Sequence, residues 1–368
     1  MRRLLVVLST LTIAMLFTIP ALPSSAGTGA HTAITIASNA GFSTCDCVSS
    51  GSGTAADPYI IGPWAIAAPS GGASGWSVKI DNSLGLITDV FDIVGISSTY
   101  NDSNTTDPTI WLVDVHTATA ISGTSANPTG GNDLGIGIEL DSSSNVSIDG
   151  VSYNKGNGTG IYLNGSSDIS INNTKLKATC TICAPHTGDG IYTVNSSNLQ
   201  IGTGADCPNT NPCNDVTYDD GFGIWLVNSH DAVINEADAD ANDTGGYVLD
   251  GPDTYNVTLE NSASHATGNI CITVNGQKVN TGYFTDLQGG LHIVNGAHNN
   301  TIVNDDFSGD TSGISVGSGG NGFYSNACTS VHQPFSPVET AMGAGNSFSN
   351  ICYASTDISG LPPSACHS

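Results

Sequence analysis

A segment of about 23 residues recurs along the second half of this sequence, and it restricts the possible folds more than any other feature. The clear copies are GIELDSSSNVSI from Gly137, GIYLNGSSDISI from Gly160, GIYTVNSSNLQI from Gly190 and GIWLVNSHDAVI from Gly223, and fainter copies begin at Gly246, Asn269, Gly290 and Gly313. Successive copies start 23, 30, 33, 23, 23, 21 and 23 residues apart, and the two longer intervals each contain a cysteine pair. A fixed period of this length indicates a solenoid, in which stacked units share one core.

Each copy begins with a short alternation of apolar and variable residues, as in Ile161 and Leu163 or Ile224 and Leu226. This period of two is the pattern of a β-strand with one buried face. Asn, Asp or Gly then follows, as tight turns with left-handed backbone angles require, at Asn164, Asn195, Asn228, Asp250, Asn275 and Asn295. A leucine-rich repeat has a similar period, but its leucine pattern and its helical half are missing. The sequence therefore predicts an all-β fold, a parallel β-helix with a continuous apolar core and corner Asn side chains hydrogen-bonded along the axis.

Several stretches resemble the repeats of right-handed parallel β-helix proteins, the superfamily of pectate lyases, polygalacturonases and NosD-like proteins. The resemblance rests on Gly160 to Leu163, on Asn299 to Ile302, and on Gly51 to Trp64, which is similar to the segment that often precedes such repeats. It covers most of residues 131–326 and lies nearest to the NosD-like repeats. It implies a single-stranded, right-handed β-helix. It leaves the activity open, because the superfamily includes lyases, hydrolases, epimerases and non-catalytic surface proteins.

The sequence divides into four parts: a signal peptide (1–26), an N-terminal cap with irregular first coils (27–130), regular coils (131–326) and a disulfide-bearing C-terminal cap (327–368). In the first part, Arg2 and Arg3 precede an apolar stretch from Leu4 to Ile19, and Ser-x-Ala before Gly27 fits a secretory cleavage site. An uncleaved anchor is the alternative, although a membrane span needs about 20 apolar residues. We therefore expect a secreted protein, extracellular or at the cell surface, with no integral membrane segment after cleavage.

The charge is strongly acidic, with 7 Lys and Arg against 32 Asp and Glu and a net charge of −25. Both arginines lie in the predicted signal peptide, at Arg2 and Arg3. Nucleic acids and anionic membrane surfaces need clustered Lys or Arg, so we expect neither as a partner.

An aromatic strip is predicted on the outer face of the first strand of each coil. The position between the two inward apolar residues reads Tyr162, Tyr192 and Trp225 on consecutive coils, flanked by Glu139, Val248, Cys271 and His292. Aromatic rings stacked at the coil spacing are suited to contact sugar rings, so Tyr162, Tyr192, Trp225 and His292 are the candidate carbohydrate-binding residues. The alternative is that the inserted loops cover these rings.

Three aspartates are the candidate catalytic residues. HTGDGI and YDDGFGI resemble Asp motifs of polygalacturonases and map onto Asp189, Asp219 and Asp220. Such carboxylates can divide general-acid and general-base roles in glycoside hydrolysis. The sequence departs from that family, because it lacks the Gly-His-Gly and Arg-Ile-Lys motifs. The alternative is that Asp-Gly only forms a turn before each strand.

A comb of acidic residues is a candidate calcium site. In EADADAND, the side chains of Glu236, Asp238, Asp240 and Asn242 alternate with alanines, so a strand would place them on one face, with Glu260 beside Glu236 on the next coil. Hard oxygen ligands of this kind bind Ca²⁺. A solvated acidic face is the alternative.

The ten cysteines are expected to form disulfides, because export leads to an oxidising compartment. Cys180 and Cys213 each lie ten residues before the glycine that starts a copy, so we expect disulfides between the two inserted loops, which also carry Cys183 and Cys207. A zinc site made by these four thiols is the alternative. Cys45 and Cys47 are too close in sequence to pair comfortably, so we expect each to bond elsewhere.

Two functions follow from these features. The first is a secreted, non-catalytic β-helix protein that binds an extracellular polysaccharide or contributes to a cell-surface layer. The alternative is a carbohydrate-active enzyme, a polygalacturonase-like glycoside hydrolase acting on a neutral glycan.

Overall fold

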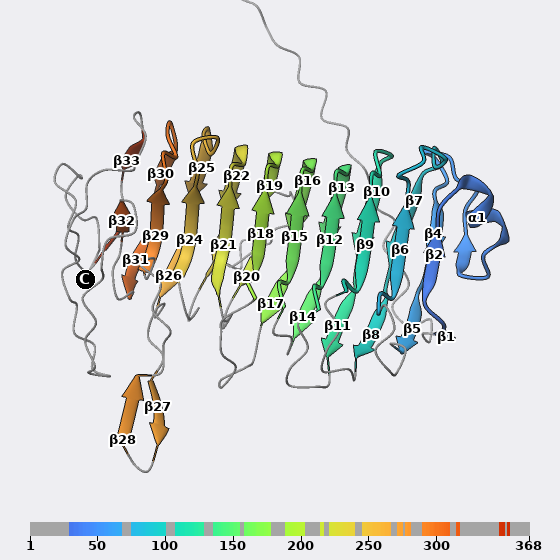
Figure 1. Ribbon diagram of the computed structural model, residues 1–368, viewed down its shortest axis with the longest axis horizontal. Helices are drawn as coiled ribbons and strands as arrows, with labels where there is room; N and C mark the ends of the chain where they lie inside the picture. The colour runs from blue at the N-terminus through green and yellow to red at the C-terminus, as the bar shows by residue number, and fades with distance from the viewer. Residues whose placement is uncertain are drawn as a thin grey trace, which may run out of the picture.

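The protein is an elongated stack of coils, each made of three short strands (Figure 1). A computed structural model describes residues 29–67, 75–100, 107–128, 135–154, 158–177, 188–202, 214–216, 221–239, 245–265, 271–274, 277–280, 289–309, 314–316, 346–349 and 352–353. Corresponding strands of successive coils pair side by side, so that three long sheets run the length of the molecule. The predicted signal peptide lies outside the described residues, as does most of the predicted C-terminal cap. No helix in the ranges just given is long and apolar enough to cross a bilayer.

The first sheet carries the strands that begin each copy of the repeat. Its ten strands are β2 (Ile34–Ile36), β6 (Val78–Asp81), β9 (Ile110–Val113), β12 (Ile138–Asp141), β15 (Ile161–Asn164), β18 (Ile191–Val194), β21 (Phe222–Val227), β24 (Gly245–Asp250), β29 (Gly289–Val294) and β32 (Ile314–Val316). All neighbours in this sheet are parallel, which is the pairing expected of a parallel β-helix.

The second and third sheets complete each coil. The second consists of β3 (Val48–Ser50), β4 (Tyr59–Ile61), β7 (Phe91–Val94), β10 (Thr119–Ser122), β13 (Ser144–Asp149), β16 (Ser167–Asn172), β19 (Ser197–Ile201), β22 (His230–Asn235), β25 (Val257–Glu260), β30 (Thr301–Val303) and β33 (Ser347–Ser349). The third consists of β1 (Gly29–His31), β5 (Trp64–Ala67), β8 (Ser97–Tyr100), β11 (Ser125–Pro128), β14 (Ser152–Asn154), β17 (Lys175–Lys177), β20 (Asn214–Val216), β23 (Ala237–Asp238), β26 (Ala263–His265), β31 (Asp306–Gly309) and β34 (Cys352–Tyr353).

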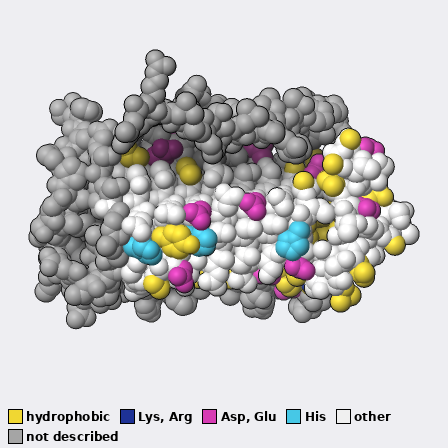
Figure 2. Space-filling model, turned by 90° about the horizontal axis from the view of Figure 1, so that it is seen from above, with side chains coloured by type: hydrophobic (Ala, Val, Ile, Leu, Met, Phe, Trp, Pro, Cys, Tyr) yellow, Lys and Arg dark blue, Asp and Glu magenta, His cyan; other side chains and the backbone are white. Residues whose placement is uncertain are grey.

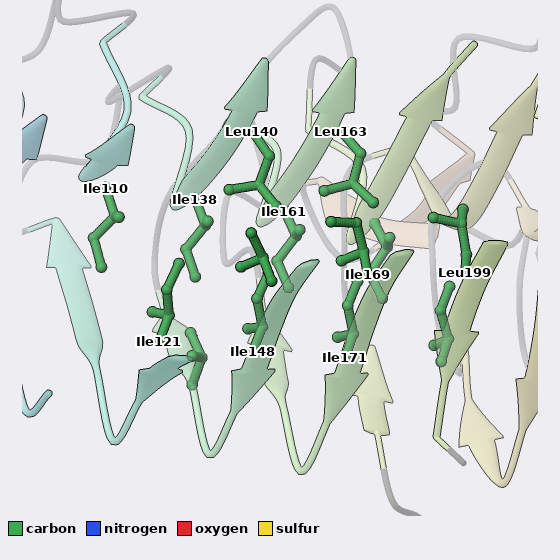
Figure 3. Close-up of a cluster of buried hydrophobic side chains, with 14 of the residues drawn as sticks. Ile110, Ile121, Ile138, Leu140, Ile148, Ile161, Leu163, Ile169, Ile171 and Leu199 are labelled. Atoms are coloured by element: carbon green, nitrogen blue, oxygen red, sulfur yellow. The ribbon is translucent and has the colours of Figure 1, made fainter. Parts of the chain in front are cut away.

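The core is a continuous column of aliphatic side chains, as the alternation predicted. Ile161 of β15 pairs with Ile138 on one side and Ile191 on the other, and all three are buried. Figure 3 shows such side chains of the first and second sheets meeting inside the coils. Because mostly apolar residues stack on one another from coil to coil, the apolar area removed from water grows with each coil added, and this burial is the main term that favours folding.

The corners after the first-sheet strands adopt left-handed backbone angles, as expected. Asn195, Asn228 and Asn295 have φ values of 51°, 47° and 52°. After Asn164 and Asp250 the following glycine has a positive φ instead, 60° at Gly165 and 97° at Gly251. Asn and Gly are the residues that adopt this conformation at least cost, which explains why they recur at these positions.

Hydrogen bonds along the axis link the polar corners, which confirms the predicted Asn ladders. Asn164 Nδ2 donates to Asp141 at 3.1 Å and Asn173 Nδ2 donates to Asp149 at 2.7 Å. Farther along the stack, Asn261 Nδ2 donates to Asn235 at 2.8 Å. Each bond joins one coil to the coil before it, so the corners reinforce the stacking of the sheets.

A buried serine follows the corner after the first-sheet strand on several coils. The serines of this ladder are Ser143, Ser166, Ser196 and Ser229, all at most 1% exposed. Each hydroxyl oxygen accepts the backbone N–H of the equivalent residue on the preceding coil; Ser166 Oγ, for example, lies 3.1 Å from Ser143 N. Ser166 Oγ also donates to the Leu140 carbonyl at 2.9 Å. The ladder satisfies backbone groups where the chain leaves one sheet for the next.

Replacing Ser166 with alanine is expected to lower the free energy of unfolding by about 1–3 kcal/mol, because the buried Ser143 N–H then has no acceptor. Urea denaturation measures the change. The matched control is Ser167→Ala at the next, partly exposed position, which should stay within about 0.5 kcal/mol of the wild type. Equal effects of the two changes would show that the ladder contributes no more than a surface hydroxyl.

Residues 29–128, where we expected irregular coils, contribute strands to all three sheets. Val78 pairs with Ile110, and Ile110 pairs with Ile138, in the same register as the later coils. These coils lack the glycine that starts the later copies, which obscured their period in the sequence. The irregular elements lie at the end of the stack: β3 and β4 are antiparallel, and α1 (Asn39–Thr44) places the buried Phe42 against Phe91.

The prediction that Asn269 starts another coil is wrong. β27 (Cys271–Val274) forms an antiparallel hairpin with β28 (Gln277–Asn280), and Figure 1 shows this hairpin projecting from the stack. β24 pairs directly with β29 instead. The NICITVNG segment has the alternation of a coil strand, but Asn-Gly is also the strongest short signal for a two-residue hairpin turn, and the strands before and after it pair with each other.

The prediction that Cys45 and Cys47 bond elsewhere is also wrong. The two form a disulfide with each other, with their Cα atoms 5.0 Å apart. This separation lies inside the range that a disulfide needs, because the chain turns at Asp46 and Cys47 and so brings the two Cα atoms close together. Cys180, Cys183, Cys207 and Cys213 lie outside the described residues.

Candidate functional site

One column of outward-facing side chains runs along the first sheet and contains the predicted aromatic strip. The pairing of β6, β9, β12, β15, β18, β21, β24 and β29 aligns Lys79, Trp111, Glu139, Tyr162, Tyr192, Trp225, Val248 and His292 in that order. We call the six residues from Lys79 to Trp225 the outer strip. All six are half-buried, whereas the side chains on either side of each along its strand point into the core.

The aromatic rings of the outer strip contact one another. The rings of Tyr162 and Tyr192 are stacked, with centroids 5.3 Å apart and an interplanar angle of 16°. Tyr192 and Trp225 follow at 5.0 Å and 37°. At these separations aromatic pairs attract each other beyond their burial of area, so the rings form one ordered surface.

The N-terminal end of the outer strip adds a cation and further indole rings. The Trp76 and Trp111 centroids are 6.1 Å apart in an edge-on contact, and Lys79 Nζ lies 3.9 Å from the Trp111 centroid. Lys79 Nζ is also 3.2 Å from Asp81, so its charge already has a partner. The sequence did not lead us to include Trp111 and Lys79 in the strip. Both occupy the same outward position on earlier strands, and extending the alignment to those strands, which lack the starting glycine, would have found them.

The C-terminal end of the column is covered. Trp225 packs against a second apolar cluster formed by Phe222, Val248 and Val294, and the Phe222 and Trp225 centroids are 4.8 Å apart. The Trp225 Nε1–H is buried and has no hydrogen-bond partner among the described residues. His292 lies in the predicted column, but it is 0% exposed and therefore cannot contact a ligand in this structure. Because Val248 and His292, the residues of the column that follow Trp225, are buried, the exposed part of the column ends at Trp225.

Glu139 is an unusual member of the outer strip, because it is a carboxyl group between aromatic rings. Burial raises the pKa of Glu139 to about 7, with further contributions from the charge of Asp141, a hydrogen bond with Asp141 and the charge of Asp107. Asp141 lies on the same face of β12 and accepts hydrogen bonds from Trp111 Nε1 at 2.8 Å and from Asn164 Nδ2 at 3.1 Å. Glu139 therefore keeps its proton to a higher pH than an ordinary carboxyl group does, and Asp141 beside it accepts two hydrogen bonds. Glu139 was noticed in the sequence only as a flank of the strip, and Asp141 was missed.

The structure places Asp189 just before β18, where its carboxylate accepts the backbone N–H of Phe222 at 2.8 Å. Burial raises the pKa of Asp189 to about 6. A Cβ atom added at Gly221 would lie 2.2 Å from Asp189 Oδ1, so the carboxylate fits closely against the next coil. This geometry is that of a turn residue. Asp219 and Asp220 lie outside the described residues, so their separation from Asp189 is not defined.

The candidate calcium ligands do not gather at one point among the residues that are described. Glu260 lies beside Glu236 as expected, since the Glu236 N–H donates to the Glu260 carbonyl at 3.3 Å, but Glu260 is aligned with Asn235 in the sheet and Glu236 occupies a corner with φ of 50°. Ala237 and Ala239 point into the core, as the alternation predicted, with Asp238 between them. Asp240 lies outside the described residues. No group of three or more His, Cys, Asp or Glu in the described ranges could hold a metal ion.

A second aromatic stack lies at a different place on the surface, at the corner between the first and second sheets. The rings of His230 and Tyr255 are 4.6 Å apart and nearly parallel, and His298 follows Tyr255 at 5.5 Å. Figure 2 views a face on which histidine side chains flank an apolar one and no Lys or Arg is visible. This corner stack provides an internal comparison for the outer strip.

Parallel coils with a linear strip of stacked rings on one outer face define a β-helix protein with an elongated aromatic surface. The chain belongs to the right-handed β-helix family, whose sequence profile, described as "Right handed beta helix region", matches residues 136–330, just over half of the chain. Membership of this family implies that the coils are right-handed.

Several solved structures share this architecture at low sequence identity. An alginate lyase from Paenibacillus sp. str. FPU-7 is 15% identical with a TM-score of 0.44, and the alignment covers 89% of this chain and 99% of that chain. The enzymatically active domain of tailspike protein 2 of bacteriophage CBA120 is 14% identical with a TM-score of 0.43, covering 89% and 42% of the two chains. The A-module of a mannuronan C-5 epimerase of Azotobacter vinelandii is 12% identical with a TM-score of 0.33, covering 83% and 72%. No curated protein sequence matches this chain. These similarities concern the fold and do not assign an activity.

Proposed function

We propose that this protein is secreted and binds an extracellular polysaccharide along the outer strip. The observation that carries the proposal is the ordered run of Tyr162, Tyr192 and Trp225 on consecutive coils, with ring contacts of 5.3 and 5.0 Å. Successive coils are about 4.8 Å apart, a spacing comparable with the length of one sugar unit. A glycan chain lying parallel to the axis would therefore meet one side chain of the strip per sugar.

The polar groups of the strip suit a sugar ligand. The tyrosine hydroxyls at the outer edge of the rings can donate and accept hydrogen bonds, and the carboxyl groups of Glu139 and Asp141 can bind sugar hydroxyls. Aromatic rings with a few placed polar groups are the usual composition of a ligand site. The predicted signal peptide supports the extracellular location of the ligand, and a polysaccharide of a cell-surface layer would fit the same strip.

Replacing Tyr192 with alanine is expected to weaken polysaccharide binding by about tenfold, because it removes the ring at the centre of the strip. Affinity gels that contain single polysaccharides identify the ligand, and isothermal titration measures the change. The matched control is Tyr255→Ala, which removes the same type of side chain from the corner stack and should leave the affinity unchanged. Equal losses in the two variants would contradict a site on the first sheet.

A further inference from the structure

The outer strip already holds one ammonium group, that of its own Lys79. Lys79 Nζ lies 3.9 Å from the Trp111 ring centroid, 5.2 Å from the Trp76 ring centroid and 3.2 Å from Asp81 Oδ2. The Lys79 side chain is only 17% exposed, so it is largely shielded from water. Burying a charge is costly unless nearby groups replace the water, and here two indole rings and a carboxylate do so. Lys79 therefore shows which surroundings the strip offers to an ammonium group.

The same kinds of group recur farther along the strip, where its described residues include no lysine. Glu139 is aligned with Trp111 on the preceding coil and with Tyr162 on the following coil. Asp141, two residues along β12, lies on the same outer face. Its carboxylate accepts the Trp111 Nε1–H at 2.8 Å, so it lies at the edge of an indole ring. Carboxylates and aromatic rings therefore meet on this coil as they do around Lys79.

Carboxylates also lie at both ends of the run of stacked rings. The strand positions two residues beyond the outer strip form a second outward column of partly exposed residues, which reads Asp81, Val113, Asp141, Asn164, Val194, Val227 and Asp250. Asp141 lies one coil before Tyr162, and Asp250 lies one coil after Trp225. A glycan that covers the stacked rings therefore reaches a carboxylate at each end.

We propose that the polysaccharide bound by the outer strip carries protonated amino groups, as a polymer of amino sugars does. The inference rests on the proposed function and names the class of its ligand. The sugar units lie along the stacked rings, and their ammonium groups lie beside Asp141 and Asp250. Each ammonium group offers three N–H donors, and a carboxylate that already accepts two hydrogen bonds, as Asp141 does, has room for more.

Charge separates this class of ligand from acidic and neutral glycans. Among the described residues of the first sheet, Lys79 is the one Lys or Arg, and Asp81 already pairs with it. A uronate on the strip would meet Asp141 and Asp250 with no unpaired cation on that sheet to balance its charge. The whole chain after the predicted signal peptide has five lysines and no arginine against 32 acidic residues. A neutral glycan avoids repulsion but gains nothing from these carboxylates beyond ordinary hydrogen bonds, whereas an ammonium group gains charge-assisted ones.

The test compares two probes that share one backbone and differ at the nitrogen. The first probe is a β-1,4-linked glucosamine oligosaccharide at a mildly acidic pH, where its amino groups carry protons, and the second is its fully N-acetylated counterpart of equal length. Isothermal titration of the full-length protein is expected to give a Kd about tenfold lower for the amino form. Asp141→Asn and Asp250→Asn are each expected to raise that Kd by about tenfold and to change the Kd of the acetylated form less than threefold.

The matched control is Asp168→Asn, which makes the same change in net charge at an exposed position of the second sheet and should leave both Kd values unchanged. Equal losses in all three variants would overturn the inference, because they would show attraction to the net charge of the protein and not to the strip. A variant that loses both probes has a disturbed strip, and the other variant then decides.

The remaining outcomes separate the inference from the proposed function. Equal or tighter binding of the N-acetylated form, or preferred binding of polygalacturonate or a neutral β-glucan, would overturn the amino-sugar class and leave the proposed function intact. Failure of every polysaccharide to bind would remove the proposed function itself. A preference for the amino form that falls in Asp141→Asn and Asp250→Asn, and persists in Asp168→Asn, is the result expected.

Discussion

Replacing Trp225 with alanine is expected to lower the free energy of unfolding by about 3 kcal/mol and to weaken polysaccharide binding in the same variant. The indole is half-buried between Tyr192 and the apolar cluster of Phe222, Val248 and Val294. Removing a large aromatic side chain from a packed site leaves a cavity and costs about 3–5 kcal/mol when the burial is complete, so a half-buried ring should lie at the lower end. Urea denaturation and titration with the bound polysaccharide measure the two effects.

Trp225→Phe is the matched control for this change. The phenyl ring keeps most of the apolar contacts, and the variant removes the buried indole N–H, which has no acceptor in the part of the chain that the structure describes. An unsatisfied buried donor costs about 1–3 kcal/mol, which offsets the smaller contact area of phenylalanine. The expected change in the free energy of unfolding is therefore below about 1 kcal/mol. Two variants of equal stability would contradict the packing of Trp225 against the cluster, and a stable Trp225→Ala that loses only binding would indicate an uncovered ring.

Asp189→Asn is expected to change how stability depends on pH. Burial raises the pKa of Asp189 from 3.8 to about 6, so the folded protein retains a proton that the unfolded chain releases between these values. The stability contributed by the protonated form is complete below pH 3.8 and is lost as the pH rises through about 6. Relative to Asp189→Asn, the wild type should lose on the order of 3 kcal/mol over this range.

Measuring the free energy of unfolding of both proteins from pH 4 to pH 7 isolates this one group, since all other titrating groups are shared. Asparagine keeps an oxygen to accept the Phe222 N–H, so the turn should remain intact. Parallel curves for the two proteins would show that Asp189 is ionised throughout and not buried as described. The variant also tests the turn role, because a turn residue can be replaced in this way without loss of polysaccharide binding.

The repeat predicted the fold because the coils share one pattern of buried strand residues and turn residues. Apolar residues at alternate positions and a left-handed corner recur, so the register of Ile138, Ile161 and Ile191 follows from their spacing alone. The outer strip follows from the same register, which is why Tyr162, Tyr192 and Trp225 could be aligned before any coordinates were known. Trp111 belongs to this register too, and only the missing glycine before Ile110 hid it.

Features that depend on non-repeating neighbours could not be predicted. The burial of His292 depends on groups packed around the end of the strip, and its position in the repeat carries no information about them. A hairpin turn and a coil strand share the alternation seen around Asn269, so the sequence does not decide between them. Similarly, the raised pKa of Glu139 arises from burial between coils and from its acidic neighbours Asp141 and Asp107, and Asp107 is 32 residues earlier in the sequence.

The position of the outer strip within the stack has a consequence for the thermodynamics of recognition. The strip occupies the coils from β6 to β21, with β2 before them and β24, β29 and β32 after them in the same sheet. In a solenoid each unit is held by its neighbours, so opening begins at the ends and reaches interior coils last. Tyr162 and Tyr192 therefore lie on a scaffold that is already ordered before the ligand arrives. The entropy cost of binding then comes mainly from the glycan, which loses conformational freedom when it binds. This cost is smallest for a glycan that is already stiff and extended in solution.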